Sequence, residues 1–212
     1  MLQEAPLTLF IIAVTVFISW RAFDNSALFE KLLNNPYTIK HHKQYYRLFS
    51  HALIHADWMH LIFNMYVFYS FGMVMESVFK AMWGNGQGSI YFLLLYIGGA
   101  LVAALPSQRK HGDNFSYNSV GASGAVSAVL MSYMVLFPTQ EVLFFFAIPM
   151  PSFVAVLIFF ALEYFMNRSG KTGIAHDAHI WGALFGILFL LFVKPAAIIN
   201  FFVQVGSVLG LT

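Results

Sequence analysis

The residues best suited to chemistry in this sequence are one serine and several histidines in strongly apolar surroundings. Ser123 lies in the small-residue stretch 120–128, Val-Gly-Ala-Ser-Gly-Ala-Val-Ser-Ala, and His179 lies in the apolar stretch 174–193. A serine hydroxyl becomes an effective nucleophile when a base takes its proton during attack, and imidazole is the commonest such base. Alone, a Gly-Ala-Ser-Gly sequence favours helix packing, because small residues let two helices approach closely in lipid. Catalysis requires that other segments bring a base and an oxyanion site to Ser123.

Composition places the chain in the lipid bilayer. Of its 212 residues, 59% are hydrophobic and 9% are charged, whereas soluble domains carry roughly 25% charged residues. We expect one compact membrane domain over residues 1–212. The lack of cysteine excludes disulfides, a thiol nucleophile and thiolate metal ligands. The net charge of +2 is too small to indicate a nucleic-acid partner.

Six segments are long and apolar enough to predict an all-α bundle of six transmembrane helices. A span needs about 20 mostly apolar residues, and the predicted spans are residues 6–23, 58–79, 89–105, 120–137, 150–166 and 174–193. Pro106 is expected to end the third span.

The connections between these segments differ in character. Residues 24–57 mix polar and aromatic side chains, which favours a folded element in the membrane interface. We expect an interfacial loop at residues 139–149, and a short interfacial helix in the tail, residues 196–212.

Polar residues of three predicted spans converge at one depth. Segments 2, 4 and 6 begin on the same side of the membrane, and His60, Asn64, Ser123 and His179 each lie near the start of one of them. A rise of 1.5 Å per residue puts all four within roughly one helical turn of a common level. His60 and Asn64 are four residues apart and therefore share a face.

Small residues predict a close contact between segments 4 and 6. The contact surfaces are Gly121, Gly124 and Ala128 on segment 4 and Gly182 and Gly186 on segment 6. Such surfaces let helices pack at short distance. The contact is expected to bring the Ser123 hydroxyl within hydrogen-bond reach of the His179 imidazole.

These positions suggest acyl-transfer chemistry. His179 is the candidate base for Ser123 and would then protonate the leaving amine. His60, Asn64 and the backbone N–H of Ser123 are candidate donors to the oxyanion. Asp177 is two residues from His179, so on a helix it points elsewhere, and we expect a Ser–His dyad rather than a triad.

Other membrane chemistries find less support. No His-Glu-x-x-His sequence is present, and no pair of aspartates lies within the spans. The pairs His51/His55 and His176/His179 have metal-ligand spacing, but no carboxylate within a span is expected to join them, so no metal site is predicted. A transporter with a histidine proton relay would rest on little more than the 8 histidines.

The sequence resembles the rhomboid family of intramembrane serine proteases over about residues 5–195. Three motifs carry the resemblance, in the family's order: His55-x4-His60-x3-Asn64, Gly121-x-Ser123-Gly124 and His179-x2-Gly182-x3-Gly186. Arg47 and Glu76 also look like family positions.

The resemblance implies a six-helix core without a cofactor that hydrolyses peptide bonds in or near the transmembrane segments of membrane-protein substrates. It implies that Ser123 is the nucleophile, His179 the base, His60 and Asn64 oxyanion residues, and His55 a loop-organising residue. It also implies that segment 5 and residues 167–177 form the substrate gate and cap. The alternative is a catalytically silent relative that binds membrane clients.

Two features depart from the family pattern. Ser127 stands where some members carry an aromatic that packs against the catalytic histidine, so we expect either that other contacts hold His179 or that the site is looser. The family places the N-terminus in the cytoplasm and the active site near the outer face of the cell membrane. That topology leaves only Lys80 and Lys194 of the 11 lysines and arginines inside, which opposes the positive-inside tendency.

Overall fold

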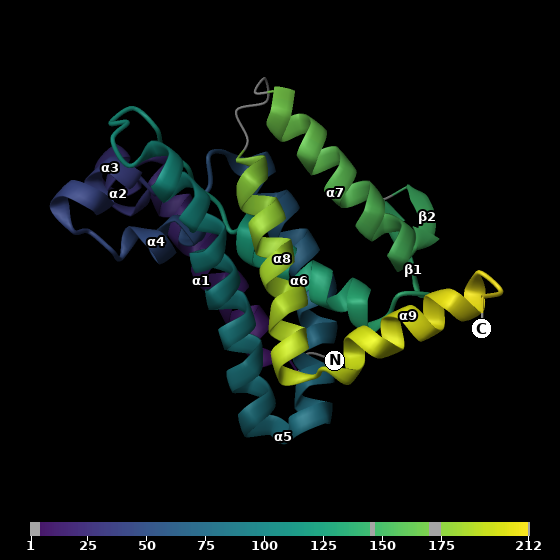
Figure 1. Ribbon diagram of the computed structural model, residues 1–212. Helices are drawn as coiled ribbons and strands as arrows, with labels where there is room; N and C mark the ends of the chain where they lie inside the picture. Colours follow the sequence, from purple (N-terminus) through teal and green to yellow (C-terminus); the bar gives the residue numbers. More distant parts are fainter. Residues whose placement is uncertain (1–4, 145–146, 170–174, 212) are drawn as a thin grey trace.

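The computed structural model describes residues 5–144, 147–169 and 175–211, and the chain folds into a helical membrane bundle (Figure 1). This confirms the predicted fold class. The elements are α1 (Pro6–Phe23), α2 (Ser26–Leu32), α3 (Pro36–His42), α4 (Arg47–Ser50), a 3-10 turn (His51–Leu53), α5 (Trp58–His111), α6 (Ser123–Leu136), β1 (Glu141–Phe144), β2 (Ile148–Pro151), α7 (Ser152–Ser169), α8 (His176–Val193) and α9 (Ala196–Val208).

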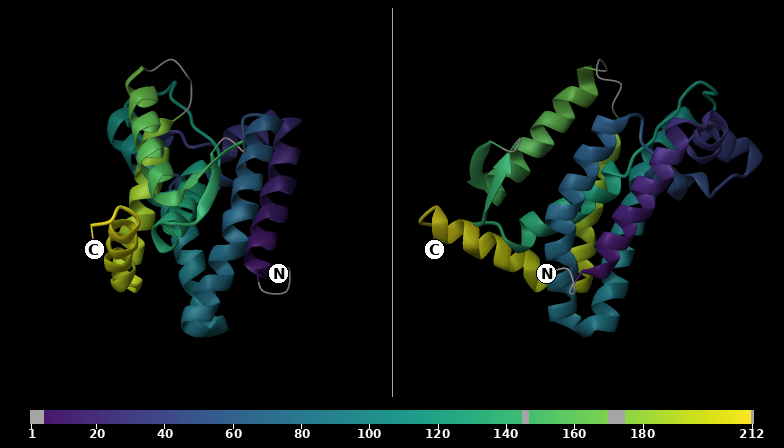
Figure 2. Two further views of the ribbon diagram at one scale, coloured as in Figure 1. Left: turned by 90° about the vertical axis from the view of Figure 1, so that its right-hand side faces the viewer. Right: turned by 180° about the vertical axis from the view of Figure 1, so that it is seen from behind.

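Helix α5 contains both the second and the third predicted segments. It turns back on itself at Gly84, whose φ of 78° is unfavourable for other residues, and Figure 2 shows the turn at the end of the bundle away from α2–α4. The prediction that Pro106 ends the third segment was wrong, because α5 continues to His111. Proline removes one N–H···O bond from the helix. The flanking turn stays in place because Ala103, Ala104 and Ser107 are buried.

Four described helices, α1, α5, α7 and α8, are long and apolar enough to cross a membrane. Helix α6 is shorter, with 14 residues, and every residue from Gly124 to Val129 is buried. A helix that is apolar on all sides belongs in the core of a bundle. The small-residue segment therefore forms the centre of the bundle, in contact with α5 and α8.

The predicted contact between segments 4 and 6 is present as the contact of α6 with α8. A Cβ at Gly182 would collide with the carbonyl oxygen of Gly124, and one at Gly186 with the carbonyl oxygen of Ala128. Gly121 was wrongly assigned to this surface. It precedes α6, has a φ of 115°, and packs against the ring of His60.

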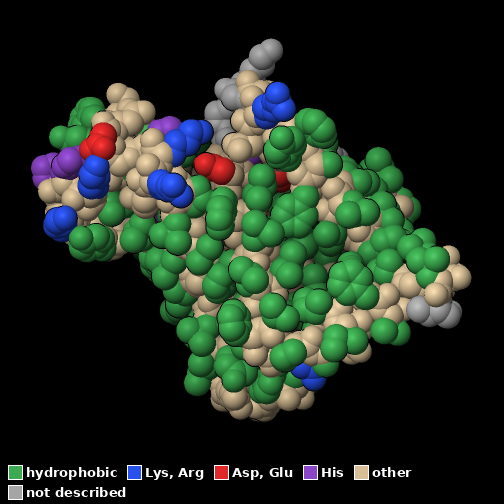
Figure 3. Space-filling model, viewed as in Figure 1, with side chains coloured by type: hydrophobic (Ala, Val, Ile, Leu, Met, Phe, Trp, Pro, Cys, Tyr) green, Lys and Arg blue, Asp and Glu red, His purple; other side chains and the backbone are tan. Residues whose placement is uncertain are grey.

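The long first connection is folded, as expected, and it binds the loop that follows α5. The Arg47 guanidinium, which is buried, donates to the carbonyl oxygens of Glu30 (2.7 Å) and Leu33 (2.9 Å). The backbones of Asn34 and Ser119 exchange two N–H···O bonds of 3.0 Å. Charged side chains gather over this end of the molecule, while the bundle below it presents mostly apolar surface (Figure 3).

A buried carboxylate ties the first helix to α5. Glu76 accepts hydrogen bonds from the backbone N–H groups of Leu7 (3.2 Å) and Thr8 (2.8 Å), which belong to the first turn of α1. It also pairs with Lys80 at 2.6 Å. The first N–H groups of a helix have no partner within the helix. Glu76 therefore satisfies donors that would otherwise be buried without acceptors.

Residues 139–149, predicted to form a loop, contain most of an antiparallel hairpin. Strands β1 and β2 pair with Val142 opposite Met150. The tail forms the predicted short helix, α9.

Helix α7 follows the hairpin and is sparsely packed (Figure 1). From Ala161 to Ser169 every residue is exposed except Glu163. The C-terminal half of α7 is thus attached to the bundle mainly through one side chain.

Candidate active site

A buried histidine organises the backbone in front of Ser123. The N–H of Ala122 donates to Nε2 of His55 (3.3 Å), so the ring proton lies on Nδ1 and is donated to Oγ of Ser19 (3.1 Å). The Ser19 hydroxyl in turn donates to the carbonyl oxygen of Leu53 (3.1 Å). His55 therefore joins α1, the first loop and the start of α6. This placement agrees with the organising role that the family resemblance implies.

Burial keeps two histidines of the first loop, His51 and His55, neutral. It lowers the pKa of His55 to about 3 and that of His51 to about 4. The His51 carbonyl accepts the N–H of Gly121 at 2.9 Å. Both rings are therefore uncharged structural elements at physiological pH.

One candidate oxyanion residue, His60, lies beside the Gly121 turn. A Cβ at Gly121 would stand 2.7 Å from Cε1 and 2.9 Å from Nε2 of His60, so only glycine allows the ring to come this close. Asn64 lies one turn further along the same face, and its amide donates to the His60 carbonyl at 2.9 Å.

Ser123 is the first residue of α6. Its backbone N–H therefore belongs to the helix N-terminus, where donors lack helical partners and negative charge is favoured. A cavity of about 20 Å³ adjoins Ser123 and is also lined by His51, Ser119 and Asp177. Within the described chain, Nε2 of His51 has no hydrogen-bond partner. This volume holds about one water molecule.

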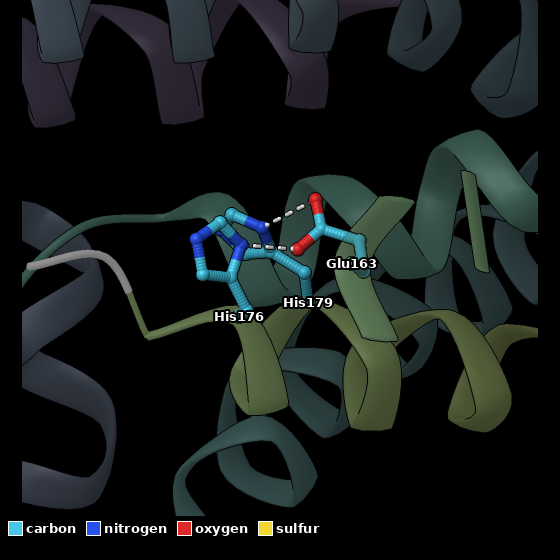
Figure 4. Close-up of side chains that lie close together, drawn as sticks. All are labelled: Glu163, His176 and His179. Atoms are coloured by element: carbon cyan, nitrogen blue, oxygen red, sulfur yellow. Dashed lines mark hydrogen bonds and ion pairs between the residues drawn. The ribbon is translucent and has the colours of Figure 1, made fainter. Parts of the chain in front are cut away.

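His179 is held by a carboxylate from α7 (Figure 4). Nδ1 of His179 lies 3.0 Å from Oε1 of Glu163, and Nδ1 of His176 lies 2.6 Å from Oε2 of the same carboxylate. An ionised carboxylate only accepts hydrogen bonds, so Nδ1 of each ring carries a proton. Nε2 of His179 is then the basic nitrogen. The expectation that contacts other than an aromatic at position 127 hold His179 agrees with this arrangement.

The structure packs α8 against α6, but among the described residues Ser123 and His179 are not hydrogen-bonded to each other. Gly182, one turn after His179, packs on Gly124, next to Ser123. The hydrogen bond of His179 nevertheless runs to Glu163, and none to Ser123 occurs among the described residues. Catalytic hydrogen bonds are often long before substrate binds. Direct proton transfer from Ser123 to His179 therefore stays a prediction.

Glu163 is the site residue that the sequence reasoning missed. The statement that no carboxylate within a span joins a histidine pair was wrong, because Glu163 joins His176 and His179. The signal was available: an ionisable residue inside a predicted span is a functional candidate wherever it occurs. Asp177, as expected, points elsewhere, and its carboxylate accepts the N–H of Ala178 at 2.9 Å.

The arrangement has the parts needed for acyl transfer from a carbonyl. It offers a hydroxyl at a helix N-terminus, an imidazole oriented by a carboxylate, and a second imidazole beside the Gly121 turn. A carboxylate that binds the far nitrogen of an imidazole fixes the tautomer and stabilises the imidazolium formed during catalysis. The site therefore carries the residue types that a serine hydrolase uses, although Ser123 and His179 share no hydrogen bond among the described residues.

Comparison with known proteins identifies relatives over most of the chain. The family model for the Rhomboid domain matches residues 42–196. The rhomboid protease GlpG of Haemophilus influenzae is 26% identical over 189 residues, which cover 88% of this chain and 90% of that protein. RHOMBOID-like protein 12, mitochondrial, of Arabidopsis thaliana is 26% identical over 85% of this chain, which spans only 56% of that protein. The rhomboid protease GlpG of Pectobacterium atrosepticum is 30% identical over 68% of this chain and 47% of that protein.

Proposed function

The chain belongs to the rhomboid family, and on that premise we propose that it is an intramembrane serine endopeptidase that cleaves membrane-protein substrates in or near their transmembrane segments. The observation that carries this proposal is the close packing of α8 on α6. It places His179, one turn before Gly182, beside the helix that begins with Ser123. We also propose that residues 1–212 form one domain that crosses the membrane six times, with both arms of α5 and the shorter α6 among the crossings.

The proposed reaction begins with attack of Ser123 Oγ on the scissile carbonyl carbon. Nε2 of His179 takes the hydroxyl proton as the C–O bond forms, and then gives it to the leaving amine as the C–N bond breaks. The Ser123 N–H, His60 and Asn64 are the proposed oxyanion donors. Removal of one such donor typically costs about 2.7–4 kcal/mol of transition-state stabilisation.

The second half of the reaction needs water inside an apolar bundle. The cavity beside Ser123 has room for about one molecule. His51, whose Nε2 has no hydrogen-bond partner among the described residues, is one of the residues that line it. A water from this cavity would attack the acyl-enzyme with His179 again acting as base. The serine hydroxyl is thereby restored and the new carboxyl end released.

Glu163 is proposed as the residue that positions the base. Its hydrogen bond to Nδ1 of His179 keeps the lone pair on Nε2, where the serine proton must go. Glu163→Gln keeps the shape of the side chain and removes its charge. We expect kcat to fall by roughly tenfold or more, with little change in KM, because the carboxylate stabilises the imidazolium of the transition state. A rise in KM with kcat unchanged would instead indicate a role in substrate binding.

The test of the function is cleavage of a purified single-span substrate in detergent or in proteoliposomes. Wild type is expected to cut the substrate, while Ser123→Ala and His179→Ala are not. Ser127→Ala is the matched control, since Ser127 is a buried serine one turn further along α6. Cleavage that survives Ser123→Ala or His179→Ala would refute the dyad.

The alternative function, a silent relative that binds membrane clients, predicts a different outcome. Wild type would then bind a substrate without cutting any of several tested sequences. The presence of Ser123, His179, His60 and Asn64 together disfavours this alternative, because a silent protein has no need of the dyad.

We propose that the active-site end faces the extracytoplasmic side of the cell membrane, as in the family pattern. Since the chain lacks cysteine, single cysteines at positions 114 and 87 report the two ends. An impermeant thiol reagent added outside intact cells is expected to label Asn114→Cys and spare Gln87→Cys. The reverse pattern would invert the topology, in the direction that the loop charges favour.

A further inference from the structure

The cluster Glu163, His176 and His179 has the composition of a zinc site. Each residue offers one ligand atom, and these atoms lie within 4.8 Å of one another. Two histidines and one glutamate are a recurring ligand set for Zn²⁺ in proteins, with water in the fourth position. Histidines three residues apart on α8 present both rings on one face, and Glu163 approaches them from α7 (Figure 4).

We infer that Glu163, His176 and His179 form a Zn²⁺ site that controls the enzyme by joining α7 to α8 and withdrawing the catalytic base. The assignment rests on side chains that already converge. Ligand atoms around a tetrahedral zinc ion are roughly 3.3 Å apart, given metal–ligand bonds of about 2.0–2.1 Å. The two Nδ1–O separations are 3.0 and 2.6 Å, to different oxygens of Glu163. With one ligand atom per residue, all separations are within 4.8 Å, so these atoms need to move by less than about 2 Å relative to one another.

The site is sheltered but can be reached. The His176 side chain is only 4% exposed, whereas Glu163 and His179 are 15% and 17% exposed. These two residues therefore provide the side from which an ion and its water enter. The carboxylate supplies negative charge to the ion, and each imidazole binds a metal through an unprotonated ring nitrogen.

The expected effect on the proposed protease follows from the tautomer of His179. With Glu163 alone, the ring proton lies on Nδ1 and Nε2 is the base. When Zn²⁺ occupies Nδ1, the ring proton moves to Nε2, which can no longer accept the Ser123 proton. This consequence rests on the proposed function, but the binding of Zn²⁺ does not.

The second effect of the ion is mechanical. Every residue of α7 from Ala161 to Ser169 is exposed except Glu163, which is half-buried. A coordinate bond from Glu163 would fasten this segment to α8. Bound Zn²⁺ would therefore oppose any motion of this segment away from α8.

Binding is tested first on the inactive Ser123→Ala protein, prepared without a histidine tag. Zn²⁺ is titrated by calorimetry, and Co²⁺ is titrated by its visible absorption, which is intense only in four- or five-coordinate sites. We expect one ion per chain with a micromolar or tighter Kd. His176→Ala and Glu163→Gln should each raise this Kd by at least roughly 100-fold, because each removes one of three protein ligands. Should His176→Ala fail to fold, the nearly isosteric Glu163→Gln carries the comparison.

The matched control is His41→Ala, since His41 also contacts a carboxylate, that of Asp113 at 2.9 Å, but on the exposed surface. His41→Ala should leave Kd unchanged. The site is refuted if the parent binds no Zn²⁺ below about 100 μM, or if His41→Ala abolishes binding while His176→Ala retains it.

Control of activity is tested second, with Ser123 restored. Zn²⁺ is expected to suppress substrate cleavage, and a chelator to restore it. Half inhibition is measured for each protein against its own metal-free rate. His176→Ala should need at least roughly tenfold more Zn²⁺ than the parent enzyme to reach it. Zinc binding without any cleavage under any condition would reject the proposed function and keep the site. Cleavage that is indifferent to Zn²⁺ bound at the site would reject the control mechanism.

Discussion

Replacement of Gly182 by alanine should weaken both the fold and the active site. The added Cβ would collide with the carbonyl oxygen of Gly124 and would stand 2.8 Å from its carbonyl carbon and 3.0 Å from its Cα. These atoms are backbone in the first turn of the core helix α6, so they cannot rotate away. Helix α8 must shift by about 1 Å, and overpacking of this kind costs about 1–3 kcal/mol.

The same shift would displace His179 from Ser123. A displacement of about 1 Å at a reacting group can lower the rate by about 10²-fold. The assay pairs substrate cleavage with unfolding in mixed micelles of increasing SDS fraction. We expect a lower unfolding midpoint and a rate reduced by about two orders of magnitude for protein that is still folded.

Two other glycines supply matched controls. A Cβ at Gly86 meets nothing within 4 Å, so Gly86→Ala should be neutral or slightly stabilising. A Cβ at Gly98 would collide only with the ring of Phe185, which can turn, so Gly98→Ala should cost less than Gly182→Ala. Wild-type stability and rate in Gly182→Ala would refute the claim that close packing of α6 and α8 sets the active-site geometry.

Three further predictions concern the supports of the site. Burial holds the pKa values of His51 and His55 far below the unfolded value of 6.5, so the unfolded chain binds more protons. Lowering the pH from 7.5 to 5 should therefore reduce the free energy of unfolding by about 2 kcal/mol for each of the two rings, measured from unfolding midpoints. Glu76→Gln removes the charge that Lys80 and the α1 N-terminus face, and SDS titration should show a loss of about 2–3 kcal/mol. Arg47→Lys loses the planar group whose Nη1 binds two carbonyl oxygens while its Nε binds Gln44. It should increase proteolysis of the first loop, with a loss of about 1–3 kcal/mol. Stability that does not depend on pH in this range, or variants as stable as wild type, would contradict these assignments.

The membrane bundle and most of the site elements could be predicted because strong physical constraints act on them. Lipid demands long apolar helices, and the 1.5 Å rise fixes how deep each polar residue lies. The small residues at Gly124, Gly182 and Gly186 therefore predicted the α6–α8 contact correctly. Gly121 was misplaced, because its role depends on a positive φ in the turn before α6 rather than on a helical face.

The elements that were missed depend on tertiary context. Whether Pro106 ends a helix depends on how well the turns around it are packed, which local preference does not reveal. The hairpin formed by β1 and β2 contains Pro149 and Pro151, which favour a loop when the pairing strand is unknown. Glu163 was identifiable as an ionisable residue within a span, but its contact with His179 depends on how α7 lies against α8.

The central claim, that Ser123 is a nucleophile activated by His179, is tested most directly by a fluorophosphonate followed by intact-protein and peptide mass spectrometry. The account predicts one adduct, located on Ser123, that is absent from Ser123→Ala. Because a positioned general base contributes about 10²–10⁴-fold, labelling should be slower by that factor in His179→Ala. An adduct on another residue, or an unchanged rate in His179→Ala, would contradict the account.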